Sequence, residues 1–193
     1  LSHDELGVIV DGLADPLQPV VAVALSSTCK GLRTPLQVAL EVLKERHARA
    51  VALCRKLETS FTELPAAEVL DWSAKGLTTD DMATLAMILQ TNGLPRLREI
   101  TLHANGFGDA GMQALCEGLG HGAFPLLHTL LLSNNNIGPV GAEVLAAALS
   151  QGALPKLALL NLSTNRIGDQ GVAALAAQLR KLPALTMLFL PQN

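Results

Sequence analysis

Aromatic residues are scarce in this chain of 193 residues, which contains no Tyr, one Trp and four Phe. Because 49% of the residues are nevertheless hydrophobic, the core has to be built mainly from Leu, Ala and Val. Small aliphatic side chains favour close stacking of many similar elements over one large globular core. The composition therefore indicates a repetitive architecture.

A concentration of charge of one sign is also missing. The 14 basic and 17 acidic residues are interspersed and give a net charge of −3. The densest basic stretch, residues 44–56, contains Glu45 and has helical spacing, which is typical of a solvated helix face. A nucleic-acid-binding surface would need a patch of Lys and Arg, so no nucleic-acid partner is expected.

Cysteines and long apolar runs are few. Cys29, Cys54 and Cys116 are far apart and lack CxxC spacing, which favours buried thiols in a reducing compartment, the cytoplasm or the nucleus. No run approaches the roughly 20 apolar residues of a membrane-spanning helix. The chain begins with Leu1 rather than Met, so removal of an organellar targeting segment is compatible with the sequence.

A repeated pattern occupies the C-terminal two-thirds of the chain. The pattern L-x-x-L-x-L-x-x-N-x-I/F-x-x-x-G-x-x-x-L-x-x-x-L starts at Leu97, Leu127 and Leu157, so its interval is constant. It starts again, after a slightly shorter interval, at Leu185, in a unit that is incomplete at the end of the sequence. A weaker copy starts near Ala67. The repeats therefore cover residues 67–193, after a connecting loop at 58–66.

Each unit changes from strand spacing to helix spacing. The L-x-L step alternates with a period of two, which predicts a short strand with one buried face. The strand residues are Ile100 and Leu102, Leu130 and Leu132, Leu160 and Leu162, and Leu188 and Leu190. The following Gly and Leu positions have helical spacing, so each unit is predicted to form a strand, a turn and a helix.

Two features of the pattern have structural interpretations. Asn occupies the same slot in four units, where its amide can satisfy backbone groups that the turn leaves unpaired; these residues are Asn105, Asn135, Asn165 and Asn193. In the first unit Lys75 replaces the Asn and Asp81 replaces the Gly. Such degeneracy at one end is typical of a capping repeat.

These residues resemble the leucine-rich repeat family, and in particular its ribonuclease-inhibitor-like class. The resemblance covers Ala67 to Asn193. It implies an α/β solenoid with a curved parallel sheet inside and helices outside. Members of the family mostly bind proteins, so the resemblance implies a protein partner.

Strand alternation predicts which residues would contact that partner. Ile100, Leu130 and Leu160 are predicted to be buried, because neighbouring strand residues point to opposite faces. The candidate partner-binding residues on the concave face are Glu99, Thr101, His103, Thr129, Leu131, Ser133, Leu159, Asn161, Ser163, Met187 and Phe189.

The concave face is predicted to become more apolar toward the C-terminus, where Leu131, Leu159, Met187 and Phe189 form a candidate patch. In the first unit the slots of Met187 and Phe189 hold Val69 and Asp71 instead. We expect the chain to continue beyond the incomplete unit, with a further repeat covering its edge and a partner covering the patch.

Residues 1–57 lack the repeat and are predicted to be helical. Short helices end near Asp15-Pro16 and Thr34-Pro35. A longer helix follows, with one continuous stripe made of Leu36, Leu40, Leu43, His47, Ala50, Cys54 and Leu57. This stripe is expected to pack on the open end of the solenoid.

Residues 1–33 resemble an F-box, a small all-α module that docks onto the adaptor of SCF-type ubiquitin ligases. The features that match include Glu5-Leu6, Ile9, Asp15-Pro16-Leu17 and Cys29-Lys30. The sequence departs from the family where Ser2 replaces the usual Pro and Leu32 the usual Trp. The resemblance implies adaptor-binding residues Leu1, Leu6, Ile9, Leu13, Pro16 and Leu17. Three amphipathic helices without an adaptor partner are the competing interpretation.

The sequence carries no catalytic or cofactor motif. Its five His residues have no metal-ligand spacing with Cys or carboxylates, and neither GxSxG nor a phosphate-binding loop occurs. Asp71 and Glu99 would share the concave face, where a solvated polar surface is favoured over acid–base chemistry. We therefore expect no enzyme activity, no metal and no cofactor.

Related repeat proteins that activate Ran-type GTPases are one enzyme-linked alternative, but the N-terminal module does not suit that role.

Two functions follow from these resemblances. In the first, the chain is the substrate receptor of an SCF-type ubiquitin ligase: the N-terminal helices hold the adaptor and the repeats hold the target. In the second, it is a scaffold subunit of a larger assembly with no role in ubiquitin transfer.

Overall fold

Strands and helices alternate along the chain, and the strands form one five-stranded parallel sheet in chain order. The computed structural model describes residues 37–60, 63–91, 93–119, 123–179 and 182–193, with side chains from residue 41 onward. The strands are β1 (Val69–Asp71), β2 (Glu99–Thr101), β3 (Thr129–Leu131), β4 (Leu159–Asn161) and β5 (Met187–Phe189). The helices are α3 (Gln37–Lys56), η2 (Leu64–Ala66, a 3₁₀ turn), α4 (Thr79–Thr91), α5 (Gly108–Gly118), α6 (Pro139–Ser150) and α7 (Gly168–Leu179). The α/β architecture predicted from the repeats is confirmed.

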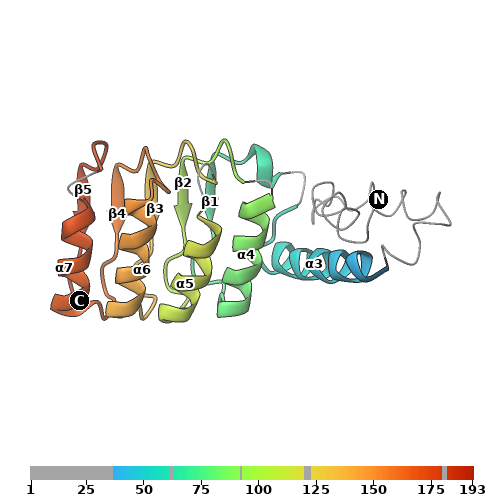
Figure 1. Cartoon of the computed structure of the whole chain (residues 1–193), viewed down its shortest axis with the longest axis horizontal. Helices are drawn as coiled ribbons and strands as arrows, with labels where there is room; N and C mark the ends of the chain where they lie inside the picture. The colour runs from blue at the N-terminus through green and yellow to red at the C-terminus, as the bar shows by residue number, and fades with distance from the viewer. Residues whose placement is uncertain (1–36, 61–62, 92, 120–122, 180–181) are drawn as a thin grey trace.

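Each strand pairs with the strand of the next unit, and residues at the same position of the repeat lie opposite one another. Leu70 pairs with Ile100, Ile100 with Leu130, Leu130 with Leu160 and Leu160 with Leu188. Figure 1 shows the units standing side by side in one row, with α3 at one end and β5 at the other. Parallel strands lie about 4.8 Å apart, whereas packed helices need about 8–10 Å. This mismatch bends the row so that the sheet face opposite the helices is concave.

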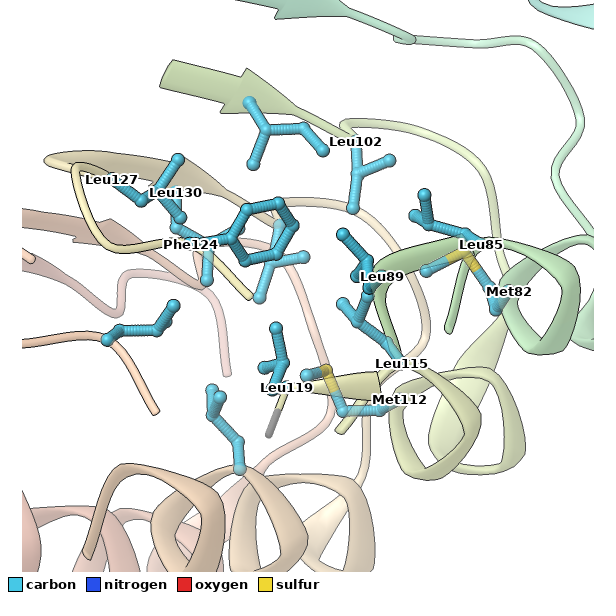
Figure 2. Packing of buried hydrophobic residues seen from close by; sticks show 14 of the residues in the cluster. Met82, Leu85, Leu89, Leu102, Met112, Leu115, Leu119, Phe124, Leu127 and Leu130 are labelled. Carbon is cyan, nitrogen blue, oxygen red and sulfur yellow. The ribbon is translucent and has the colours of Figure 1, made fainter. Parts of the chain in front are cut away.

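A single hydrophobic core runs between the sheet and the helices. Leu70, Ile100, Leu130 and Leu160 are all buried in it, which confirms the predicted strand register. Figure 2 shows side chains from α4 and α5 turned toward strand residues and toward Phe124, which lies in the return segment before β3. Each helix therefore covers its own strand and part of the neighbouring unit.

Leu188 is the exception to the predicted burial. Its counterparts in β2, β3 and β4 are at most 2% exposed, but Leu188 is 38% exposed. It belongs to β5, which pairs only with β4 and forms the edge of the sheet. The alternation of the strand places the Leu188 side chain on the core face, as predicted. On the outer side of β5, however, no described residue covers it.

A column of asparagines ties each unit to the preceding one. The Asn135 amide donates to the carbonyls of Leu132 (3.0 Å) and Leu102 (2.9 Å), and its Oδ1 accepts from the N–H groups of Asn105 (2.9 Å) and Gly106 (3.0 Å). Asn165 makes the same two amide bonds, and its Oδ1 accepts from the N–H groups of Asn135 and Ile137. Asn105 and Asn193 make equivalent amide bonds to their own and the preceding unit. The structural role predicted for the Asn slot is confirmed.

A second tie between units comes from Asp109, at the start of α5. Its Oδ1 accepts hydrogen bonds from the backbone N–H groups of Gly138 (2.6 Å) and Gly141 (2.9 Å). These N–H groups lie at the N-terminus of α6, where a helix has unpaired donors and favours a negative charge. Gly141 also has to be small, because a Cβ there would lie 2.8 Å from Ile137 Cγ2.

The C-terminal half of α3 packs on the first unit. Ala50, Leu53, Cys54 and Leu57 are buried in the same core as the repeats, and α3 contacts α4. The predicted stripe is therefore largely confirmed: Leu43 is also buried and His47 is partly buried, whereas the side chains of Leu36 and Leu40 lie outside the described residues.

The two departures from the repeat in the first unit both pair with charges near the end of α3. Lys56 Nζ lies 2.6 Å from Asp81 Oδ2, and Lys75 Nζ lies 3.1 Å from Glu58 Oε1. Asp81 also accepts from the Thr78 N–H (2.8 Å) and hydroxyl (2.9 Å), which caps the start of α4. The Lys and Asp that break the repeat thus join it to α3.

The Asp81 contacts change its proton affinity. Burial alone would raise its pKa, but the hydrogen bonds from Lys56 and from Thr78 outweigh burial and lower the pKa below its ordinary value of 3.8. Because the pKa of Asp81 is lower in the folded than in the unfolded protein, its charge stabilises the fold. This stabilisation is complete above the pKa of the unfolded state and is lost as the pH falls through the pKa of the folded state.

Replacement of Asn135 by Ala is expected to lower the free energy of unfolding by about 2–4 kcal/mol, because it leaves buried N–H groups without acceptors. Urea denaturation followed by circular dichroism measures this loss. The control Gln113→Ala removes an exposed amide from α5 and is expected to cost less than about 0.5 kcal/mol. Equal losses in the two variants would show that the column is not structural.

Replacement of Asp81 by Asn is expected to lower the free energy of unfolding by about 1 kcal/mol at pH 7, because the charge that pairs with Lys56 is lost. The difference from the parent should shrink toward zero as the pH falls below 3.8, where the parent Asp81 becomes protonated. Denaturation at several pH values measures it. Asp80→Asn, an exposed neighbour, is the control; a pH-independent difference for Asp81→Asn would contradict the assignment.

Candidate functional site

The candidate site is the concave face of the sheet, formed by side chains that flank the buried strand residues. β2, β3 and β4 share one burial pattern, in which the central residue is buried and its two neighbours are partly exposed. The side chains of Glu99, Thr101, Thr129, Leu131, Ser133, Leu159, Asn161 and Ser163 are partly exposed, and those of His103, Met187 and Phe189 are exposed. The strand register thus brings together on one surface all eleven residues predicted from the alternation.

The part of this face nearest the first unit carries the carboxylates of Asp71 and Glu99 beside the exposed side chain of Val69. The Asp71 carboxylate accepts hydrogen bonds from the Ser73 N–H (3.0 Å) and hydroxyl (2.6 Å). Asn161 Oδ1 holds Ser163 in the same way on β4, at 2.9 and 2.6 Å. Two different residues at the same slot therefore make the same turn, one of them carrying a negative charge.

Asp71 keeps that charge at neutral pH. The hydrogen bonds from the Ser73 side chain and backbone lower its pKa, and the charges of Lys75 and His103 lower it further. Glu99 is the other carboxylate of the face and lies on β2 beside Val69. Neither carboxylate forms an ion pair with a residue that the structure describes.

One hydrogen bond crosses from β2 to β3 on this face. His103 Nδ1 lies 2.8 Å from Ser133 Oγ, between equivalent slots of neighbouring units. A serine next to a histidine is also the start of a nucleophilic pair, which requires a third group to orient the imidazole and donors for an oxyanion. This pair is a polar contact between neighbouring repeats, with His103 exposed and Ser133 partly exposed.

The part of the face over β3, β4 and β5 is apolar. Leu159 pairs in register with Met187, while Leu131 and Phe189 flank Asn161 on either side. Met187 is 47% exposed and Phe189 is 43% exposed, and Leu131 and Leu159 are partly exposed although they lie on interior strands. We call these four residues the apolar patch. They lie together at the C-terminal end of the sheet.

The chemically reactive groups elsewhere in the described chain are held in inactive forms. Burial raises the pKa of the Cys54 thiol to about 11, and burial together with Glu117 raises the pKa of Cys116 to about 12. Neither thiol is therefore a thiolate nucleophile at neutral pH. Within the described ranges, no cluster of three His, Cys, Asp or Glu residues could hold a metal ion.

Two shallow clefts lie on the helical side. One of about 330 Å³ lies between α3 and α4 and is lined by Arg49, Ala52, Asp80, Asp81, Ala83 and Thr84. Its carboxylate Asp81 is already paired with Lys56. The other, also about 330 Å³, lies between α5 and α6 and includes the protonated Cys116.

The predicted adaptor-binding residues Leu1, Leu6, Ile9, Leu13, Pro16 and Leu17 lie outside the described residues. The sequence pattern placed Val69 and Asp71 on the concave face, but they were not among the predicted partner-binding residues. The signal that includes them is strand register: Val69 pairs with Glu99 and Asp71 with Thr101. The site therefore extends over all five strands.

Two segments of the solenoid, residues 125–146 and 153–176, match the family model described as Leucine Rich repeat. The first contains β3 and most of α6, and the second contains β4 and most of α7. These two segments are leucine-rich repeats. Leucine-rich repeats generally mediate protein–protein interactions. No curated protein matches the sequence. In the described part of the chain, none of the helices has the length and hydrophobicity needed to cross a bilayer.

Proposed function

We propose that the chain binds a protein partner through the concave face of its leucine-rich repeats and catalyses no reaction of its own. The observation that carries the proposal is the apolar patch, whose four large side chains are exposed or partly exposed on one continuous surface. Exposed apolar groups that are rimmed by polar residues mark interaction surfaces. The rim here is formed by Thr129, Ser133 and Ser163, while Asn161 lies between Leu131 and Phe189.

The concave face suits binding because its side chains are not needed for folding. The core residues of the strands point the other way, and the described side chains leave no buried polar atom without a partner. A rigid sheet holds the exposed side chains in fixed positions, so little conformational entropy is lost when a partner binds.

We further propose a specific role, that of the substrate receptor of an SCF-type ubiquitin ligase. The F-box resemblance of residues 1–33 supports this role, and the repeats would then hold the target protein. The interval from Leu97 to Leu127 to Leu157 and the helix in each complete unit support the ribonuclease-inhibitor-like class of repeat. The unpaired thiols of Cys54 and Cys116 support a reducing compartment, the cytoplasm or the nucleus. A scaffold subunit would use the same concave face without an adaptor.

The double variant Leu131→Ser, Phe189→Ser is expected to weaken capture of a partner at least about tenfold, because two apolar contacts are lost from the interface. Its melting temperature should fall by only a few degrees, since neither side chain is in the core. Quantitative affinity purification and a thermal melt measure the two effects.

The matched control for this experiment is Val140→Ser, which removes an apolar side chain that is 56% exposed on α6, on the helical side. It should leave partner capture unchanged. If the double variant keeps its partners, or if it loses more than about 3 kcal/mol of stability with binding intact, the concave face is not the binding surface.

The ligase role is tested separately through the N-terminal module. Leu6→Asp and Leu17→Asp are each expected to abolish binding of purified SCF adaptor, because a carboxylate would be buried in an apolar contact. The repeats should still unfold at the parent temperature. Val42→Asp, at an exposed position of α3, is the control. Absence of adaptor binding by the parent chain, or unchanged binding by both variants, would leave the scaffold role.

A further inference from the structure

The two ends of the concave face differ in chemistry. Over β1 and β2 the strand slots hold the carboxylates of Asp71 and Glu99, and over β3 to β5 they hold the apolar patch. No Lys or Arg occurs in residues 69–73, 99–103, 129–133, 159–163 or 187–191, which are the strands and the two residues after each. Val69 on β1 is also exposed, but both carboxylates lie at this end of the face and the four residues of the apolar patch lie at the other.

The carboxylates are available to a partner. Lys75, whose charge acts on Asp71, is itself paired with Glu58 at 3.1 Å. The side chain of Asp71 is exposed and held in place by Ser73, so it would lose little conformational freedom on binding. Glu99 is partly exposed on the adjacent strand, two residues before Thr101, the residue that pairs in register with Asp71. A cation placed between them would meet two negative charges.

The apolar patch is not simply the uncovered end of the stack. A further strand would pair along the edge of β5 and would cover Leu188, as each interior strand covers its neighbour. It would leave the face open, because Leu131 and Leu159 have strands on both sides and are still partly exposed. The patch therefore needs an occupant that crosses the strands from the concave side.

The distance between the acidic and the apolar end of the face sets how far apart the two contacting groups of that occupant must lie. The acidic pair is centred between β1 and β2 and the apolar pair Leu159–Met187 between β4 and β5, three strand intervals away. At about 4.8 Å per interval the two centres are about 14 Å apart. This separation corresponds to about ten residues of a helix or about four residues of an extended chain.

Resting on the proposed function, we infer that the occupant is a segment of a partner protein that carries a Lys or Arg and a large apolar side chain about 14 Å apart. The basic side chain lies between Asp71 and Glu99. The apolar side chain lies against Leu159, Met187 and Phe189. Opposite charges fix the direction of the segment across the strands, and the apolar contact supplies most of the affinity.

The test uses a library of random peptides, each about 16 residues long so that a helix can span both ends, displayed on phage and selected against the whole chain. Selected peptides are synthesised and titrated at low and high salt against the parent and three variants. The acidic-pair variant combines Asp71→Asn with Glu99→Gln. The apolar-patch variant combines Leu131→Ser with Phe189→Ser. The control variant combines Asp80→Asn with Asp169→Asn and removes two exposed charges from α4 and α7. The Asp71→Asn change is expected to keep the turn, because Asn161 holds Ser163 in the same geometry.

The expected result is a family of peptides with a basic and an apolar residue at separated positions. Affinity should fall about fivefold or more for the acidic-pair variant and tenfold or more for the apolar-patch variant, and should not change for the control. The salt dependence of binding should disappear only in the acidic-pair variant. Replacing the peptide's basic residue by Ala should cost affinity against the parent but not against that variant.

The remaining outcomes overturn the inference in distinguishable ways. Peptides that require the apolar patch but bind the acidic-pair variant normally, or that are themselves acidic, would contradict the basic partner and keep the concave-face function. Peptides insensitive to both concave variants would contradict that function as well. Failure to select any peptide would exclude a short segment as the occupant. A dimer in sedimentation that dissociates in the apolar-patch variant would make the occupant a second copy of the chain.

Discussion

The asparagine column is the constraint on which the arrangement of the repeats depends. A turn that follows a three-residue strand leaves buried N–H and C=O groups that no strand partner can reach, and each unpaired group would cost about 1–3 kcal/mol. Asn135 satisfies groups of its own unit and of the unit before it, with no exposed surface at all. Because the same side chain serves two units, the hydrogen bonds of each turn are complete only when the next unit is stacked on it. Stacking of the units and formation of the turns are therefore coupled.

The ends of such a stack need a different solution, and the first unit shows one. Its Asn slot holds Lys75 and its Gly slot holds Asp81, and these two charges pair with Glu58 and Lys56 beside the end of α3. An interior Gly is small because a Cβ there would clash, as at Gly141 with Ile137 of its own unit and with Asp109 of the preceding unit. Asp81, in the first unit, instead caps α4 and pairs with Lys56 at the end of α3. The breaks in the pattern are thus the positions where the repeat meets something that is not a repeat.

Periodicity made most of the fold predictable because each slot has one environment throughout the stack. The buried position of Ile100, Leu130 and Leu160, the concave position of their neighbours and the role of the Asn column all follow from that regularity. Contacts that occur once could not be predicted in this way. The Asp109 cap on α6 has no counterpart between α6 and α7, since the equivalent residue at the start of α6 is Pro139, which has no carboxylate. The His103–Ser133 hydrogen bond likewise depends on two unrelated residues falling into adjacent slots.

The same division explains why the partner is harder to infer than the fold. Folding is secured by the Leu, Gly and Asn slots, which contribute the core and the ties between units, and it places almost no demand on the residues that alternate with them on the concave face. Those residues can therefore differ from strand to strand without cost to stability, and here they change from Asp71 and Glu99 to Met187 and Phe189 along one sheet. Because the strands hold this gradient at fixed spacing, the information about the partner lies in the order of charge and apolarity across the strands. No single repeat contains it.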